Sequence, residues 1–400
     1  MGSGPRGLGS YILLSPYCAV NMLRYWTAGE SHGKTLLALV DGFPAGVTVD
    51  TDPINFELKR RQGGYGRGGR QRIETDKVDV RSGVWKGVTL GSPIALEVLN
   101  RDYKLERLED LPRPRPGHGD LTGAMKYLGS IRGVLERASA RETAVRVAAG
   151  ALAKQLLAAF DISVFGYVLE VGPERIEPVD GTLDELRAIR DESEVYGLNL
   201  DRDPAIKQLI DCAGKDGDTL GGIVEVRVDG CPFGLGTHAQ WDQKLDGRLA
   251  QAVMAVQAIK GVEIGLGFEA ARRPGSQVHD PINYDRSKQD TATLGYERPT
   301  NNAGGIEAGM TNGQPIIVRA AKKPISTLAK PLASINLDTK EAEEASYERS
   351  DVCAISAASV IVENVVAFEI ARAFIDKFGG DSLVEMQARY KLFLEMAQER

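Results

Sequence analysis

Two histidines stand in polar, glycine-rich turns, a setting that suits proton transfer to a ligand. His32 lies in TAGESHGKT (residues 27–35), and His118 lies in RPRPGHGD (residues 113–120), where a nearby aspartate can fix its tautomer. Imidazole changes its charge near neutral pH, and glycine neighbours leave the ring open to a ligand. We therefore predict that His32 and His118 are catalytic. The other two histidines are interpreted as structural or surface groups.

The segment around His32 comes within one residue of a nucleotide-binding P-loop. A P-loop has four residues between its glycines before Lys-Ser/Thr. Here Gly29 and Gly33 enclose only three, and Ala28 stands at the position that would complete the pattern. The turn is therefore predicted to present His32 and not to hold a nucleoside triphosphate.

Residues 59–72 (KRRQGGYGRGGRQR) carry six basic side chains and no acidic one. Glycines between arginines let several guanidinium groups converge, and each can bind phosphate or carboxylate through two hydrogen bonds. This patch predicts a small polyanionic ligand, with a solvated basic loop and a single-strand RNA contact as alternatives. The formal pattern Gly64-x-Gly66-x-x-Gly69 follows a predicted helix and not a strand, which disfavours dinucleotide binding.

Three further polar segments are candidates for ligand binding. Arg137 and Arg141 are four apart in a predicted helix, so they are expected to share one face, as a binding pair or within an internally paired helix. The Gly-rich residues 301–313 could lay backbone amides against a flat ligand. Arg349 and Asp351 are expected to point the same way on an extended segment, as a salt bridge or a binding pair.

Composition limits the classes of protein. A chain of 400 residues with 42% hydrophobic residues can bury a large core, and a net charge of −6 argues against a nucleic-acid-binding protein. The four cysteines have no CxxC spacing, and neither a metal-ligand cluster nor a segment of membrane-spanning length is evident. We therefore predict a cytoplasmic protein without a metal site. Residues 1–21 are predicted to be a disordered leader, native or added, and residues 22–400 a single domain.

Hydrophobic patterning predicts an irregular mixture of strands and helices. Strands are expected at residues 36–49, 78–91, 94–99, 223–228 and 316–321. Helices are expected at residues 54–61, 130–160, 239–256, 356–378 and 382–399. Because these elements do not alternate as βαβ units, the pattern favours an α+β fold over a doubly wound sheet.

The ordered set of motifs resembles the chorismate synthase family, from about Met22 to the last predicted helix. The matching segments are TAGESHG (27–33), RRQ (60–62), GYGRG (64–68), RPGH (115–118), SARETA (139–144), NNAGGIEAGMTN (301–312) and RSDV (349–352). Each is short, but their order along the chain is highly specific. The resemblance implies an α+β fold, a β-α-β sandwich with an internal pseudo-repeat and long active-site loops, assembled as a homotetramer.

The resemblance also implies the last step of the shikimate pathway. In that step 5-enolpyruvylshikimate-3-phosphate loses phosphate and a ring proton by anti-1,4-elimination, which gives chorismate. The family uses reduced FMN, which donates an electron transiently although the reaction has no net redox change. Some members reduce the flavin with NADPH, but no added reductase module is evident here. The alternative is a non-catalytic protein that binds flavin or a phosphate ligand on the same scaffold.

The resemblance assigns roles to residues of this sequence. His32 would donate a proton to the departing phosphate, His118 would stabilise or protonate the anionic edge of the flavin, and Asp351 would help to relay the ring proton. Arg61 and Arg67 would bind substrate anions or NADPH. The implied FMN contacts are Arg137, Ala138, Ser139, Gln257, Ala258, Ala308, Lys323, Pro324, Ile325, Ser326, Thr327 and Arg349.

Three positions depart from the family pattern. Gly119 stands where alanine is usual, and Ser356 stands where proline is usual. Ala308 replaces a glycine whose backbone usually faces the flavin. Its added methyl group is expected to tune flavin affinity.

Overall fold

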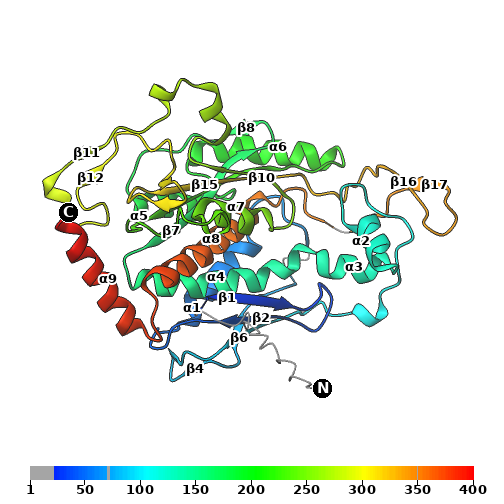
Figure 1. Cartoon of the computed structure of the whole chain (residues 1–400). Coiled ribbons are helices and arrows are strands. Elements are labelled where there is room, and N and C mark those ends of the chain that lie inside the picture. The colour runs from blue at the N-terminus through cyan, green and yellow to red at the C-terminus, as the bar shows by residue number, and fades with distance from the viewer. Residues whose placement is uncertain (1–21, 70–72, 349) are drawn as a thin grey trace, which may run out of the picture.

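Two antiparallel sheets enclose a layer of helices in the computed structural model, which describes residues 22–69, 73–348 and 350–400 (Figure 1). The strand orders are β1-β2-β6-β3 in the first sheet and β10-β15-β9-β7-β8 in the second. The first sheet consists of β1 (Arg24–Ala28), β2 (Thr35–Asp41), β6 (Ile94–Leu99) and β3 (Val78–Val80). The second consists of β10 (Ile259–Ile264), β15 (Ile316–Lys322), β9 (Gly222–Asp229), β7 (Ser163–Val171) and β8 (Glu174–Arg175). This β-α-β sandwich confirms the predicted α+β class.

Three helices form most of the layer between the sheets: α1 (Thr51–Gln62), α4 (Thr143–Ala158) and α8 (Ile355–Phe378). α4 packs on β2 and β6 of the first sheet, and α8 packs on β7 and β9 of the second. α8 is buried on nearly all sides, as its unbroken apolar composition requires. The two helices meet closely at Gly150, where an added Cβ would lie 2.1 Å from the Asn364 carbonyl oxygen. The crossing therefore requires glycine.

The chain is built from two copies of one ββαββα unit. The first half contains β1, β2, α1, β3, β6 and α4, and the second contains β7, β9, α7 (Leu245–Met254), β10, β15 and α8. In sheet order, β1-β2-β6-β3 then corresponds to β7-β9-β15-β10. Other elements interrupt the units at different places in each half, and hydrophobic periodicity therefore fails to reveal the repeat. The pseudo-repeat implied by the resemblance is present.

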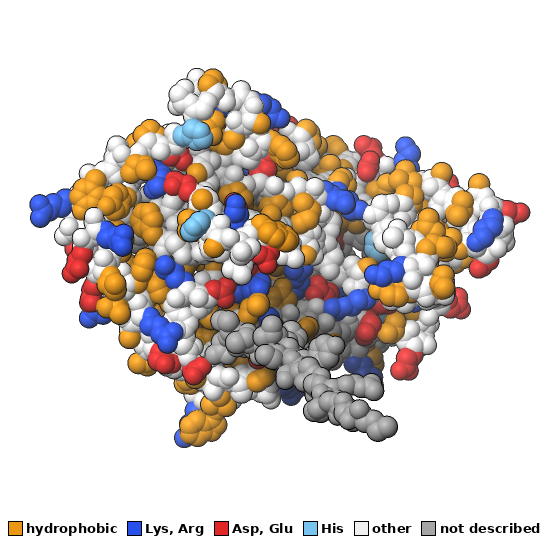
Figure 2. Space-filling model, in the orientation of Figure 1, with side chains coloured by type: hydrophobic (Ala, Val, Ile, Leu, Met, Phe, Trp, Pro, Cys, Tyr) orange, Lys and Arg blue, Asp and Glu red, His pale blue; other side chains and the backbone are white. Residues whose placement is uncertain are grey.

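Shorter elements lie in the connections. α2 (Asp120–Tyr127), α3 (Ile131–Ala138) and the hairpin of β16 (Ala333–Ile335) and β17 (Ala342–Glu344) project together at the right of Figure 1. Figure 2 shows the surface hollowed between this projection and the main body, with Lys and Arg side chains along the hollow. Other helices of the described part are α5 (Leu183–Glu192), α6 (Asp203–Lys215) and α9 (Leu383–Gln398). Its short ladders pair β4 (Val84–Trp85) with β5 (Val88–Thr89), β11 (Asn283–Tyr284) with β12 (Tyr296–Glu297), and β13 (Ile306–Glu307) with β14 (Met310–Thr311).

The helix predicted for residues 130–160 is interrupted. Ser139 is extended, with φ −61° and ψ 141°, and its side chain accepts from the backbone N–H of Arg141. α3 therefore ends before it, and α4 begins after a short 3-10 turn. The prediction that Arg137 and Arg141 share one helix face was wrong, because this break turns them towards different partners.

Other predicted elements are present with different limits. α1 begins at Thr51, earlier than predicted, because the Asp50 side chain caps the helix by accepting from the Asp52 N–H. The strand predicted for residues 36–49 ends at Asp41, and the helix predicted for residues 239–256 is shorter as α7. The predicted leader, residues 1–21, lies outside the described residues. Within the described part, the structure contains no helix that is both long and apolar enough to cross a membrane.

Candidate active site

A cavity of about 430 Å³ lies where corresponding parts of the two repeats come together. Its wall includes the C-terminal end of α1, at Arg61, and the residues just beyond α7, 256–258. It also includes the N-terminal ends of α4, at Thr143, and of α8, at Ala357. The N-terminal ends of α4 and α8 carry partial positive charge and attract an anionic ligand, whereas the C-terminal end of α1 carries the opposite partial charge.

The turn between β1 and β2 presents His32 to this cavity. Asn100 holds the turn, because its Nδ2 donates to the carbonyls of Glu30 and Gly33 at 3.1 and 2.8 Å. Glu136 of α3 holds the ring, with Oε1 2.9 Å from Nδ1 and Oε2 accepting from the His32 backbone N–H at 2.8 Å. An ionised carboxylate only accepts hydrogen bonds, so Nδ1 carries a proton. The other ring nitrogen, Nε2, is left for a ligand.

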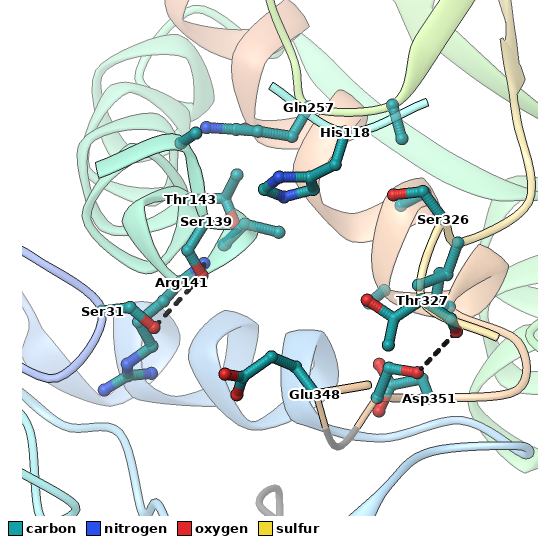
Figure 3. A pocket seen from close by; sticks show the side chains of 18 of the residues that line it. Ser31, His118, Ser139, Arg141, Thr143, Gln257, Ser326, Thr327, Glu348 and Asp351 are labelled. Atoms are coloured by element: carbon teal, nitrogen blue, oxygen red, sulfur yellow. Dashed lines mark hydrogen bonds between the residues drawn. The ribbon is translucent and has the colours of Figure 1, made fainter. Parts of the chain in front are cut away.

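His118 is held by its own loop and projects into the cavity (Figure 3). Asp120, which is fully buried, contacts the Nδ1 of His118. The same carboxylate accepts from the backbone N–H, Nε and Nη2 of Arg115 at 2.8 to 3.1 Å. Arg115 also donates from Nη1 to the Thr327 hydroxyl at 3.0 Å. An arginine and a carboxylate thus fix this second ring.

Both supporting carboxyls are ionised in the folded protein. Burial opposes ionisation of Asp120, but hydrogen bonds from His118 and Arg115 outweigh it and hold the pKa of this carboxyl far below its usual range. Burial likewise opposes ionisation of Glu136, and its hydrogen bonds with His32 lower the pKa of that carboxyl. Each histidine therefore faces a negative charge at Nδ1, which favours a proton there.

Arg61 and Arg141 lie on one side of the cavity in fixed orientations. Arg61 donates from Nε to the Thr143 hydroxyl at 2.9 Å and from Nη2 to the Ala140 carbonyl at 2.8 Å. Burial lowers the pKa of Arg61 to about 10, so its guanidinium remains charged at neutral pH. Arg141 donates from Nη1 to Asp76 at 2.6 Å. Both side chains are therefore already ordered before a ligand binds.

Asp351 is held between an arginine and a backbone amide. Arg67 Nη1 lies 3.0 Å from its Oδ2, and the Gly68 N–H donates to its Oδ1 at 2.6 Å. An added Cβ at Gly68 would lie 3.0 Å from the Ser350 carbonyl oxygen, so glycine permits this close approach. Arg67 Nε and Gln257 Oε1 are buried, and no described residue supplies them with a hydrogen-bond partner. Both groups are therefore suited to contact a ligand.

Lys322 places a buried amine at the end of an apolar row on β15. It ends the inward-facing row of β15, which otherwise consists of Ile316, Val318 and Ala320, and it lines the cavity. Burial, with the positive charge of Arg67, lowers the pKa of Lys322 to about 8. An anionic ligand beside this amine would stabilise its charged form.

Cationic side chains outnumber carboxylates on the wall. The cations are Arg61, Arg67, Arg115, Arg141, Lys322 and Lys323, and the carboxylates are Glu74, Glu348 and Asp351. Figure 3 shows that Ser31 and Ser139 lie on one side of the space, and Ser326, Thr327 and Asp351 on the other. The cavity is therefore suited to a ligand with several negative charges.

The chorismate synthase family model matches residues 23–375. The chain belongs to the chorismate synthase family. It is 54% identical to the chorismate synthase of Geobacter metallireducens over 388 residues, which cover 94% of this chain and 99% of that protein. It is 50% identical to that of Enterococcus faecalis over 392 residues, or 93% and 100% of the two chains. A crystal structure of chorismate synthase aligns with a TM-score of 0.77 and 40% identity, covering 95% of this chain and 99% of the other.

Chorismate synthases are carbon–oxygen lyases of the shikimate pathway, and membership of the family implies a requirement for reduced flavin. The polar groups of the cavity wall suit the charged groups of such a flavin and of an anionic substrate. Its cations suit phosphate and carboxylate groups, and Arg67 Nε and Gln257 Oε1 offer a donor and an acceptor without described partners.

The cavity gathers most of the site residues that the family resemblance implied. Those on its wall are His32, His118, Asp351, Arg61, Arg67, Ala138, Ser139, Gln257, Ala258, Lys323, Pro324, Ile325, Ser326 and Thr327. Arg137 is not on the wall, because its guanidinium donates to the carbonyls of Thr27 and Gly29 at 2.8 and 3.0 Å. Ala308 lies in the turn between β13 and β14, away from this wall. Arg349 lies outside the described residues.

The three departures from the chorismate synthase pattern have different surroundings. Gly119 lines the cavity, with nothing within 4 Å of an added Cβ, so alanine would fit there. Ser356 is buried, and its hydroxyl donates to the Val195 carbonyl at 3.0 Å. Ala308 has φ 51°, a left-handed conformation that costs a non-glycine residue about 1–2 kcal/mol. Its backbone conformation therefore gives a reason for glycine at this position.

Three important residues escaped the sequence-based prediction of this chorismate synthase site. Glu136 supports His32 from 104 positions along the chain, and no local motif joins them. Glu348 precedes a recognised motif by one residue and lines the cavity. Lys322 could have been found, because it directly follows the strand predicted for residues 316–321 and continues its inward-facing positions.

Proposed function

We propose that this chain converts 5-enolpyruvylshikimate-3-phosphate to chorismate by anti-1,4-elimination of phosphate and a ring proton. The observation that carries the proposal is the presence of two histidines, each held at Nδ1 by a buried carboxylate, in one arginine-lined cavity. Such a site can bind a multiply charged substrate and move protons at fixed atoms. The reaction forms part of aromatic amino acid biosynthesis.

His32 donates a proton to the departing phosphate. Because Glu136 holds Nδ1, Nε2 is the nitrogen that meets the phosphate oxygen. Asp102 Oδ2 lies 4.0 Å from Nε2 and places a negative charge beside this nitrogen. Arg61 and Arg67 bind the anionic groups of the substrate. Proton donation and anion binding both offset the negative charge that develops on the leaving group.

Reduced FMN, when bound, supplies the electron density that helps the C–O bond to phosphate to break. His118, held at Nδ1 by Asp120, would offer its ring to the anionic edge of this group. Asp351 helps to relay the ring proton, with its carboxylate oriented by Arg67 and by the Gly68 N–H. The wall residues that would hold FMN are Ala138, Ser139, Gln257, Ala258, Lys323, Pro324, Ile325, Ser326 and Thr327. Arg137 and Ala308, which lie off this wall, and Arg349 stay predicted FMN contacts that rest on the family resemblance alone.

The proposal extends to the source of electrons and to assembly. NADPH can act as flavin reductant in this site only if it reaches Arg61 and Arg67, the two positions that bind it in self-reducing members. We propose that another protein reduces the flavin for this enzyme. We place the enzyme in the cytoplasm as a homotetramer, to be tested by cell fractionation and by light scattering.

The direct test is an anaerobic assay for chorismate, run once with chemically reduced FMN and once with NADPH plus oxidised FMN. Chorismate is expected in the first assay, and none is expected in the second unless a flavin reductase is added. Folded, flavin-bound protein that makes no chorismate with reduced FMN would falsify the proposal.

The second candidate is a protein that binds flavin or a phosphate ligand without turnover. The cation-rich wall alone would support this function. It predicts flavin binding without product and little change in ligand affinity for His32→Ala. The enzyme proposal instead expects His32→Ala to keep flavin binding and to lower kcat by about 10²–10⁴-fold, the usual contribution of an acid–base group.

A further inference from the structure

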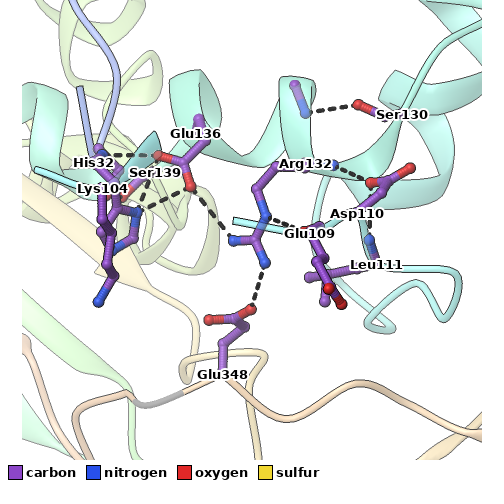
Figure 4. A network of polar contacts seen from close by, with 12 residues as sticks. His32, Lys104, Glu109, Asp110, Leu111, Ser130, Arg132, Glu136, Ser139 and Glu348 are labelled. Atoms are coloured by element: carbon purple, nitrogen blue, oxygen red, sulfur yellow. Dashed lines mark hydrogen bonds and ion pairs between the residues drawn. The ribbon is translucent and has the colours of Figure 1, made fainter. Parts of the chain in front are cut away.

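Arg132 connects the carboxylate that holds His32 to a second carboxylate across the cavity edge (Figure 4). Its Nη2 lies 3.1 Å from Glu348 Oε1, whereas its Nη1 lies 3.4 Å from Glu136 Oε1. Its Nε donates to the Glu109 carbonyl at 2.9 Å, which helps to fix the guanidinium plane. The closer of the two ion pairs is therefore the one with Glu348.

Burial alone would predict that Arg132 pairs more closely with Glu136 than with Glu348. The side chain of Glu136 is 1% exposed and that of Glu348 is 33% exposed, and charges attract more strongly away from water. Two features weaken the inner pair. Both Glu136 oxygens already contact His32, at its ring or backbone nitrogen. In addition, an arginine four positions before a glutamate is the less favourable order on a helix.

We propose that Glu348 and Arg132 are positioning residues that act on His32 through Glu136. Glu348 draws the guanidinium outwards, so the Glu136 carboxylate remains available to the Nδ1–H of His32. Without the charge of Glu348, Arg132 turns to Glu136 and competes with the imidazole for its oxygens. The chain segment that leads into Asp351 thereby also controls how firmly His32 is held.

A separate ion pair faces the other side of the His32 ring. Asp102 Oδ2 lies 4.0 Å from Nε2 and 3.2 Å from Lys104 Nζ. Because this pair approaches Nε2, it acts on the opposite nitrogen from the one that Glu136 holds. Substitutions of Arg132 or Glu348 should therefore alter the hydrogen bond at Nδ1 of His32.

The first test follows the Nδ1–H protons by NMR in protein labelled with ¹⁵N-histidine. Glu348→Gln is expected to move the His32 Nδ1–H signal upfield, because its hydrogen bond to Glu136 weakens. Arg132→Gln is expected to move it downfield, because the competing charge is gone while an amide can still donate to the Glu109 carbonyl. The double variant should match Arg132→Gln, because Glu348 acts only through Arg132. The His118 signal serves as an internal control, and Glu344→Gln, an exposed change on β17, as the matched variant.

The second test is kinetic and rests on the proposed role of His32. Glu348→Gln is expected to lower kcat about threefold to tenfold, less than a direct loss of an orienting partner. In the Arg132→Gln background the same change should lower kcat by less than about 1.5-fold. A direct contact of Glu348 with substrate would instead raise KM in both backgrounds, and that result would overturn the proposal.

The NMR test separates failure of this proposal from failure of the proposed function. Opposite shifts of the His32 signal support the positioning role even if the protein makes no chorismate. An unmoved His32 signal in both single variants overturns it, as does a Glu348→Gln shift that persists in the Arg132→Gln background. If Arg132→Gln fails to fold, Arg132→Met replaces it with the same expected downfield shift.

Discussion

The two histidines of the cavity are held by the same chemistry but by different kinds of structure. His118, its carboxylate and its arginine all come from residues 115–120. His32 is held by a carboxylate 104 positions away, on α3, and that carboxylate is linked through Arg132 to a third segment of the chain. A local site needs only its own loop to be folded, whereas an assembled site depends on how separate elements pack. The two sites should therefore fail in different ways.

The largest effect is expected from Asp120→Asn at the local site. This change removes the buried charge that compensates Arg115, so the free energy of unfolding should fall by about 3–5 kcal/mol. Urea denaturation measures the loss, with Asp338→Asn, an exposed change near β16, as the control. A loss below about 1 kcal/mol would mean that the loop does not depend on this carboxylate.

Glu136→Gln at the assembled site should act mainly on turnover. Glutamine can still accept from the His32 backbone N–H, but it lacks the charge that favours a proton at Nδ1. We expect kcat to fall about 10- to 100-fold with little change in KM, because Glu136 acts through His32. Steady-state assays with reduced FMN measure both constants. A rise in KM with unchanged kcat would place Glu136 among the substrate contacts instead.

The dependence of stability on acid pH allows a direct comparison of the Asp120 and Glu136 carboxyls. Both have a lowered pKa, so each contributes stability that is present above its ordinary value, 3.8 for Asp120 and 4.5 for Glu136. That contribution is lost as pH falls through the folded value. The stability difference between wild type and each variant should be constant above about pH 5.5 and shrink below about pH 4. Urea denaturation from pH 7 to pH 3 measures this stability difference. A difference that grows on acidification would show that the pKa of the carboxyl is raised in the folded protein and not lowered.

The smallest effect is expected from Asp102→Asn. Asp102 and Lys104 form a partly exposed pair beside Nε2 of His32, and such pairs contribute about 0–1 kcal/mol. We expect a loss of less than about threefold in kcat and no measurable change in unfolding. A loss as large as that of Glu136→Gln would show that both ring nitrogens need a carboxylate, and the comparison would then have to include Asp102.

The local site was largely predictable from the sequence, and the assembled one only in part. Proline, glycine and aspartate around His118 already indicated a stiff loop with a carboxylate near the ring. The turn of His32 was equally evident, but its partner lay in a segment predicted to be one long helix. The break at Ser139 follows from its side chain, which accepts from the Arg141 N–H, and alanine-rich neighbours masked that signal.

Tertiary packing accounts for what the sequence could not indicate. The sequence placed Arg61 at the end of a predicted helix and Asp351 on an extended segment, and the sandwich brings both to one cavity. The pairing of Glu348 with Arg132 joins segments 216 positions apart, which no local pattern encodes. Lys322 is the one charged residue at the inward-facing positions of β15, which are otherwise apolar. A charged residue at such a position is more common at functional sites than elsewhere.

The repeated ββαββα unit bears on how such a cavity could arise. Two half-length chains, each folded as one unit, would form the same sandwich as a symmetric pair and would line its centre twice with identical side chains. Once the two halves are joined in one chain, each half can have different side chains. A short turn between β1 and β2 now carries His32, while the matching connection between β7 and β9 has grown to include α5 and α6. An unsymmetrical ligand needs unlike walls, and a duplicated chain is one way to obtain them.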